Sequence, residues 1–120
     1  MTPEQKFWQL LKPHVPGHVN RIENTVGVGI PDVTYCYQGT ETWIELKAGS
    51  VLRDSQYIWH HQHALAGGIV YLIQRDKDII AVRKATAILK EYILIGYFHK
   101  PWNWATIEAI LKGEKWLKYT

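Results

Sequence analysis

The segment Gly29–Gly49, GIPDVTYCYQGTETWIELKAG, has the pattern of a β-hairpin and decides how the rest of the chain is interpreted. Its first half, residues 32–37, is rich in β-branched and aromatic residues, which favour strands. Residues 38–40 form the predicted turn, and residues 42–47 form the return strand. Pro31 marks the start of the first strand because it has no backbone N–H to donate to a sheet.

The return strand carries charged and apolar side chains in alternation. Successive side chains of a strand point to opposite faces, so Glu45 and Lys47 share one face while Ile44 and Leu46 share the other. A loop centred on Gly39–Thr40 then sets Asp32 opposite Lys47. In that register Asp32 and Glu45 are diagonal neighbours, about 7–8 Å apart at the backbone. The sequence therefore predicts two carboxylates and an amine at one end of the hairpin.

This trio has a chemical interpretation and a structural one. Two neighbouring carboxylates repel each other unless a hard cation lies between them, and Mg²⁺ takes few protein oxygens beside water and phosphate. Such a metal activates water and stabilises charge on a phosphate, and Lys47 is then available to position the water or offset that charge. In the structural alternative, Asp32 caps a turn, Glu45 pairs with Lys47, and nothing binds.

Two motifs of the chain resemble those of a known nuclease family. Pro31-Asp32 followed by Glu45-Leu46-Lys47 resembles the PD-(D/E)XK motif. Arg53-x-x-Gln56-x-x-Trp59 followed by Gly67-Gly68 resembles the small phage-type members near the VRR-NUC branch, which include stand-alone Holliday-junction resolvases. The resemblance extends over about residues 20–74.

The resemblance implies a fold and a set of roles. The expected fold class is α/β, a restriction-endonuclease-like core with a mixed central sheet of four or five strands flanked by helices. Asp32 and Glu45 are expected to bind Mg²⁺, for which Mn²⁺ substitutes, together with the carbonyl oxygen of Leu46. Lys47 is expected to orient or activate water, and Gln56 to orient Lys47, the water or a phosphate.

A third carboxylate often completes the metal site in the resembling family. Glu23, on a predicted strand upstream of Asp32, is the first candidate, and the alternative for it is a surface pair with Arg21. Glu4 is the second candidate, although a carboxylate in the first turn of a helix also has a plain role beside the helix dipole. Arg21, Arg53 and His60 are the predicted contacts to nucleic acid.

The remaining elements follow from periodicity and from turn residues. Helices are predicted over residues 3–12, from Asp54 or Ser55 to Ala66, and over residues 104–112 after an Asn103 cap, and strands over 19–26, 69–74 and 78–82. Residues 84–95 have a mixed pattern, helical at first and extended from Tyr92.

The second predicted helix carries Gln56, Trp59, His60 and His63 on one face. We interpret this face as a polar ridge exposed to solvent or DNA. His60 and His63 are spaced to share a zinc ion, but no cysteine or further closely spaced histidine completes a site, so the sequence disfavours zinc.

Length and composition limit the remaining possibilities. The 120 residues are expected to form a single domain, 1–120, and 47% hydrophobic residues indicate a globular chain. The net charge of +3 is compatible with a polyanionic partner. Cys36 is the single cysteine, which excludes an internal disulfide, and it is expected to be buried. No signal peptide or membrane span is predicted, so the cytosol is the expected location.

The predicted function is Mg²⁺-dependent hydrolysis of DNA phosphodiester bonds, with four-way junctions as the first substrate by analogy with the resembling family. A simple nickase or flap nuclease is one alternative, and a non-catalytic nucleic-acid-binding subunit is another. Two cuts per junction favour a homodimer, with the C-terminal third or the Gln56 helix in its interface. Aromatic residues crowd that third: Tyr97, Phe98, Trp102, Trp104 and Trp116.

Overall fold

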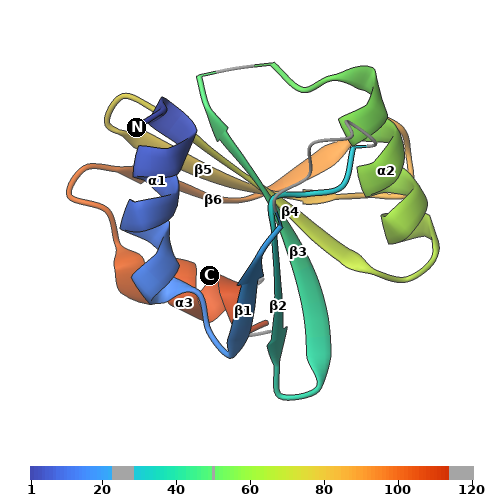
Figure 1. Ribbon diagram of the computed structural model, residues 1–120, viewed down its shortest axis with the longest axis horizontal. Coiled ribbons are helices and arrows are strands. Elements are labelled where there is room, and N and C mark those ends of the chain that lie inside the picture. The colour runs from blue at the N-terminus through green and yellow to red at the C-terminus, as the bar shows by residue number, and fades with distance from the viewer. Residues whose placement is uncertain (23–28, 50, 114–120) are drawn as a thin grey trace.

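The computed structural model describes residues 1–22, 29–49 and 51–113, and Figure 1 shows its elements. They are α1 (Pro3–Leu11), a 3₁₀ turn η1 (Lys12–His14), β1 (His18–Arg21), β2 (Val33–Tyr37), β3 (Thr40–Ala48), α2 (Asp54–Leu65), β4 (Ile69–Asp76), β5 (Ile79–Ala85), β6 (Tyr92–His99) and α3 (Trp104–Leu111). No helix among these is long and apolar enough to cross a membrane.

The strands form one sheet in the order β1-β2-β3-β4-β5-β6. β3 and β4 run parallel with α2 connecting them, and the other neighbours are antiparallel. The predicted α/β class with a mixed sheet is confirmed, but the sheet has six strands in place of four or five. The additional strand is β6, whose first half falls in the segment 84–95 that had a mixed pattern.

The helices lie on both sides of the sheet, with α1 and α3 on one side and α2 on the other (Figure 1). The main core lies between the sheet and the α1–α3 side. Its buried members are Phe7, Leu11, Val15, Val33, Tyr35, Ile44, Leu46, Tyr71, Ile73, Ile80, Val82, Ile107, Ile110 and Leu111. Because Ile44 and Leu46 enter this core, Glu45 and Lys47 face the opposite side of β3, as their alternation predicts.

The hairpin register differs from the prediction by two residues. Tyr37 pairs with Thr40, so the turn consists of Gln38 and Gly39. Both have positive φ, 50° and 81°, which is the combination required by the two-residue turn whose twist matches a hairpin. Continuing this register by one residue sets Asp32 opposite Glu45 instead of Lys47, so the carboxylates are direct cross-strand neighbours.

Two other predictions on the hairpin and on α2 were wrong. Cys36 is exposed, because Val33 and Tyr35 point into the core and Cys36 points away from it. The residue at the N-cap of α2 is Arg53, in place of Asp54 or Ser55. The predicted helices 3–12 and 104–112 are confirmed within one residue, including the predicted Asn103 cap, and the side chain of Thr2 caps the first of them.

Candidate active site

Asp32 and Glu45 meet where β2 begins beside the C-terminal half of β3. The backbone N–H of Leu46 donates a hydrogen bond of 2.9 Å to Oδ2 of Asp32, which holds that carboxylate against β3. Glu45 is 1% exposed. Burial is the largest of the causes that raise the pKa of the Glu45 carboxyl to about 10. A hydrogen bond with Asp32 and repulsion from the Asp32 charge add to this shift. Without a cation, Glu45 is therefore protonated at neutral pH.

His60 supports Glu45 from α2. Its Nε2 atom lies 3.1 Å from Oε1 of Glu45, and its Nδ1 atom lies 2.7 Å from the hydroxyl of Tyr92 on β6. Burial lowers the pKa of His60 to about 4. The neutral arrangement that satisfies all three groups has the Glu45 carboxyl donating to Nε2 and Nδ1–H donating to Tyr92.

These contacts correct the prediction for His60. The side chain is completely buried, so it is not part of a ridge that faces solvent or DNA. Trp59 and His63, predicted for the same face, stack at 4.6 Å between ring centroids and form an aromatic cluster with Trp43 of β3. The cluster covers the sheet beside Glu45, since Trp43 and Glu45 are two residues apart on one strand face.

Lys47 lies on the same face of β3 as Glu45 and is 8% exposed. Its charge lowers the pKa of Glu45, against the larger effects that raise it. Among residues 1–22, 29–49 and 51–113, the ion pairs within 4.0 Å are His14–Glu108 and His60–Glu45, so Lys47 forms none with another described residue. The structural alternative of a Glu45–Lys47 salt bridge is therefore wrong.

Glu4 approaches this site from α1. The Thr2 hydroxyl accepts a hydrogen bond from the N–H of Gln5, and the Gln5 side chain accepts one from the N–H of Thr2. This reciprocal cap fixes the first turn of α1. Repulsion from Glu4 contributes to the raised pKa of Glu45, so the two carboxylates act on each other. Glu23, the first candidate for a third carboxylate, lies outside the described residues.

The predicted helper residues have different surroundings. Gln56 is buried, and its Oε1 accepts a 2.8 Å hydrogen bond from the N–H of Arg53, so its amide caps α2. Arg53 itself is exposed. Arg21 lies with its guanidinium carbon 5.7 Å from the centre of the Trp8 ring. One of its terminal nitrogens is buried and has no hydrogen-bond partner within residues 1–22, 29–49 and 51–113, which leaves a donor that an anion could satisfy.

Sequence reasoning missed the contributions of β4, β5 and β6. Lys47 pairs with Gln74 in the sheet register, and Gln74 accepts a hydrogen bond from Arg83 of β5. Tyr92 reaches His60 from β6. No local pattern signals these contacts, because each joins residues from strands that the chain reaches later.

The donor set of the site fits Mg²⁺ better than zinc. No three His, Cys, Asp or Glu side chains of the described ranges cluster as a metal-binding group. Mg²⁺ needs only one or two carboxylates, with water and phosphate as further ligands. A buried carboxyl such as Glu45, whose pKa is raised by burial and by the neighbouring Asp32, is a group that a divalent cation stabilises in its charged form.

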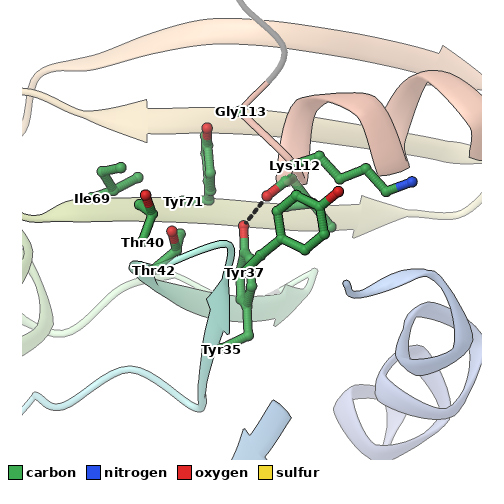
Figure 2. A pocket seen from close by; sticks show the side chains of 9 residues that line it. Tyr35, Tyr37, Thr40, Thr42, Ile69, Tyr71, Lys112 and Gly113 are labelled. Atoms are coloured by element: carbon green, nitrogen blue, oxygen red, sulfur yellow. Dashed lines mark hydrogen bonds between the residues drawn. The ribbon is translucent and has the colours of Figure 1, made fainter. Parts of the chain in front are cut away.

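A separate cavity of about 220 Å³ lies at the turn end of the hairpin, and Figure 2 shows its lining. Tyr35 donates a 2.7 Å hydrogen bond to the carbonyl of Leu111, and Tyr71 donates one to Ile110. Because both hydroxyls are used to hold the end of α3, this cavity serves the packing of α3 and contains none of the candidate catalytic residues.

The raised pKa of Glu45 gives a stability prediction for the protein in EDTA. A folded-state pKa of about 10, against 4.5 for the ordinary carboxyl, means that stability falls as pH rises between these values. Glu45→Gln keeps a neutral side chain, so it should exceed the wild type in unfolding free energy by up to about 3 kcal/mol at pH 7.

Urea unfolding of both proteins at several pH values measures this difference. The difference in unfolding free energy between the two proteins should widen from pH 5 to pH 8. His60 also contributes stability that is lost as pH falls from 6.5 towards 4, but this contribution is common to both proteins. Equal stability at pH 8 would show that Glu45 ionises freely in the folded protein.

The likenesses of this chain to known proteins lie among solved structures. No protein-family model matches the chain, and no curated protein sequence matches it. Among solved structures, the chain is similar to Hjc of Archaeoglobus fulgidus, a Holliday junction resolvase from an archaeal hyperthermophile. The TM-score is 0.48 and the identity is 14%, over 82% of this chain and 87% of that one.

Proposed function

We propose that this protein is a Mg²⁺-dependent endonuclease that hydrolyses DNA phosphodiester bonds. The observation that carries the proposal is the pairing of half-buried Asp32 with the buried Glu45 of β3. Lys47, on the same strand as Glu45, is an amine without an ion-pair partner among the described residues. A cation on the carboxylates and a phosphate near the amine would satisfy all three groups. The resemblance to PD-(D/E)XK nucleases, and to their small phage-type VRR-NUC relatives, supports the same assignment.

Asp32 and Glu45 would hold the metal, with the carbonyl of Leu46 as a further oxygen ligand. Glu4 is the favoured third carboxylate because its charge already acts on Glu45; Glu23 remains the alternative. When bound, Mg²⁺, or Mn²⁺ in its place, activates water and stabilises the charge that develops on the phosphate. His60 and Tyr92 fix the direction of the Glu45 carboxylate.

The cationic residues divide into two roles. Lys47 orients the attacking water or stabilises the phosphate, because it shares a strand face with Glu45. Arg21 binds a neighbouring phosphate through the guanidinium nitrogen that has no hydrogen-bond partner among the described residues. Arg53, exposed at the start of α2, contacts the DNA backbone at a greater distance from the scissile phosphate. Gln56 acts indirectly, by capping α2 and thereby holding His60 in position.

Branched DNA is the proposed substrate class, with four-way junctions first. The proposal rests on the family analogy, and it includes a homodimer because resolution needs two cuts related by a two-fold axis. Nicking of simple duplexes and cleavage of flaps are the alternatives. A non-catalytic binding subunit is disfavoured, because a carboxylate pair near phosphate weakens binding unless a metal offsets it.

Incubation with labelled linear, nicked, flap and four-way DNA of matched sequence, in Mg²⁺, tests the substrate class. Paired, symmetric cuts in the junction, with slower cleavage of linear duplex, are the expected result. Equal rates on all four substrates would replace the resolvase assignment with a general nuclease. Binding without cleavage in either Mg²⁺ or Mn²⁺ would favour the non-catalytic alternative.

Tyr92→Phe tests whether the hydrogen-bond chain from Tyr92 through His60 to Glu45 contributes to metal binding. The substitution removes the hydroxyl on Nδ1 of His60, so the His60–Glu45 contact loses its orientation. Loss of such an outer partner typically weakens metal binding about 10–100-fold, and we expect about tenfold for Mg²⁺ by calorimetry. Tyr57→Phe is the matched control, because the Tyr57 ring packs beside Tyr92. Unchanged affinity in Tyr92→Phe would remove His60 and Tyr92 from the site.

A further inference from the structure

β6 forms one edge of the sheet and exposes apolar side chains. Ile93, Leu94, Ile95 and Tyr97 are exposed by 54%, 52%, 38% and 51%. The edge strand carries no charged residue from Tyr92 to Phe98. Proteins usually protect an edge strand with charge, proline or a covering element, since its outer N–H and C=O groups otherwise pair with another strand. This edge has none of the charges that would repel a partner strand.

The exposed side chains lie on both faces of β6. Leu94 pairs with Arg83 and Tyr97 with Ala81, and these two partners are two residues apart on β5. Leu94 and Tyr97 therefore point to the same face, although three residues separate them. The register shift of β6 opposite Val82 and Arg83 explains this, because Ile95 is an extra residue between the two pairs.

We infer that β6 is a dimer interface in which β6 of a second copy pairs with it antiparallel, so that the two sheets continue into each other. With the two-fold axis at Ile95–Gly96, Leu94 of each copy lies opposite Tyr97 of the other. Directly opposed antiparallel residues point to the same face. Leu94 and Tyr97 meet that condition only because the extra residue Ile95 forms a β-bulge between them.

The charges at the ends of β6 favour the same partner. In this register Glu91 of one copy lies opposite Lys100 of the other, so an acidic and a basic residue meet at each end of the paired strands. The apolar run between them meets an identical run. A second copy of the chain therefore matches both the apolar run and the charges at its ends. An unrelated strand would match both only by coincidence.

The pairing has a geometric consequence for the proposed nuclease. The register links Glu45 to Leu72, Arg83 and Leu94 across the sheet, and links Lys47 to Gln74, Ala81 and Tyr97. Two Glu45 sites would then lie on one face of a continuous sheet, seven strand spacings or about 30–35 Å apart. The interface itself rests on β6 alone and does not depend on the nuclease assignment.

Light scattering of the intact protein at micromolar concentration tests the oligomeric state. We expect about twice the chain mass of 14.0 kDa. Leu94→Lys/Tyr97→Lys should give a folded monomer, because four lysines then meet across the two-fold axis. Val51→Lys/Leu65→Lys is the matched control, since both residues are more exposed than those of β6. A monomeric wild type, or a dimeric Leu94→Lys/Tyr97→Lys protein, would overturn the interface.

Cysteine pairs test the register in a Cys36→Ser background. Leu94→Cys/Tyr97→Cys should cross-link two chains on mild oxidation, because opposed antiparallel residues have Cα atoms about 4.5–5.5 Å apart, within disulfide range. Within one chain these positions are about 10 Å apart and do not join. Ile93→Cys/Tyr97→Cys, with positions on opposite faces, should not cross-link. A dimer without the first cross-link would contradict this register, and a DNA-cleavage assay on the same proteins judges the nuclease proposal separately.

Discussion

Asp32→Asn and Glu45→Gln should each abolish DNA cleavage and Mg²⁺ binding at this site while the fold remains intact. Each substitution removes one of two charges that a hard cation needs as ligands, and neither amide supplies a comparable oxygen. DNA binding should be unchanged or tighter, because a negative charge near phosphate has been removed. Calorimetry in Mg²⁺ with circular dichroism of the same samples measures both results.

Asp78→Asn is the control for this pair, because it removes one carboxylate from the exposed turn between β4 and β5. It should bind Mg²⁺ and cleave DNA like the wild type. If Asp32→Asn and Glu45→Gln also bind Mg²⁺ like the wild type, the carboxylate pair is not the metal site. In that outcome Glu45 is a buried neutral group that packs α2 against the sheet.

Lys47→Ala should lower the cleavage rate at saturating DNA by at least about a hundredfold, the range for a lost charge-stabilising or proton-transfer group. Mg²⁺ affinity should change much less, since Lys47 is not a ligand. Lys84→Ala removes a cation from the neighbouring part of the sheet and should retain activity. Near-native cleavage by Lys47→Ala would leave the amine without a catalytic role.

Gln56→Ala should have a smaller effect on cleavage and a measurable one on stability. The Gln56 amide accepts the N–H of Arg53, and loss of a helix cap costs about 1 kcal/mol. A stability effect with little change in cleavage would mean that Gln56 acts as a helix cap and has no direct catalytic role. A large loss of activity in a fully stable Gln56→Ala protein would restore that role.

The faces of the hairpin were predictable from the sequence, but its register was not. Alternation alone separates Ile44 and Leu46, which enter the core, from Glu45 and Lys47. The register depends on which residues form the turn, and Gln38 has no feature that signals a positive φ. Asp32 therefore faces Glu45 instead of Lys47, and the predicted carboxylate pair lies closer together than expected.

The surroundings of Glu45 depend on tertiary contacts. The spacing of Gln56, Trp59, His60 and His63 predicts a shared helix face but not how that face is turned toward the sheet. His60 contacts Tyr92, 32 residues further along the chain. The segment before β6 was ambiguous. Residues 84–89 favour a helix locally, but in the structure Lys84 and Ala85 continue β5 because they pair with β6. Long-range pairing decides such segments.

Cleavage of a labelled four-way junction by the wild-type protein, measured in Mg²⁺ and again in EDTA, tests the central claim most directly. The claim is that the Asp32–Glu45–Lys47 cluster hydrolyses DNA with a divalent metal. We expect symmetric cuts in Mg²⁺, recovery of activity in Mn²⁺, no product in EDTA, and no product from Glu45→Gln under any condition. Equal cleavage by the wild type and Glu45→Gln, or cleavage that persists in EDTA, would contradict the claim.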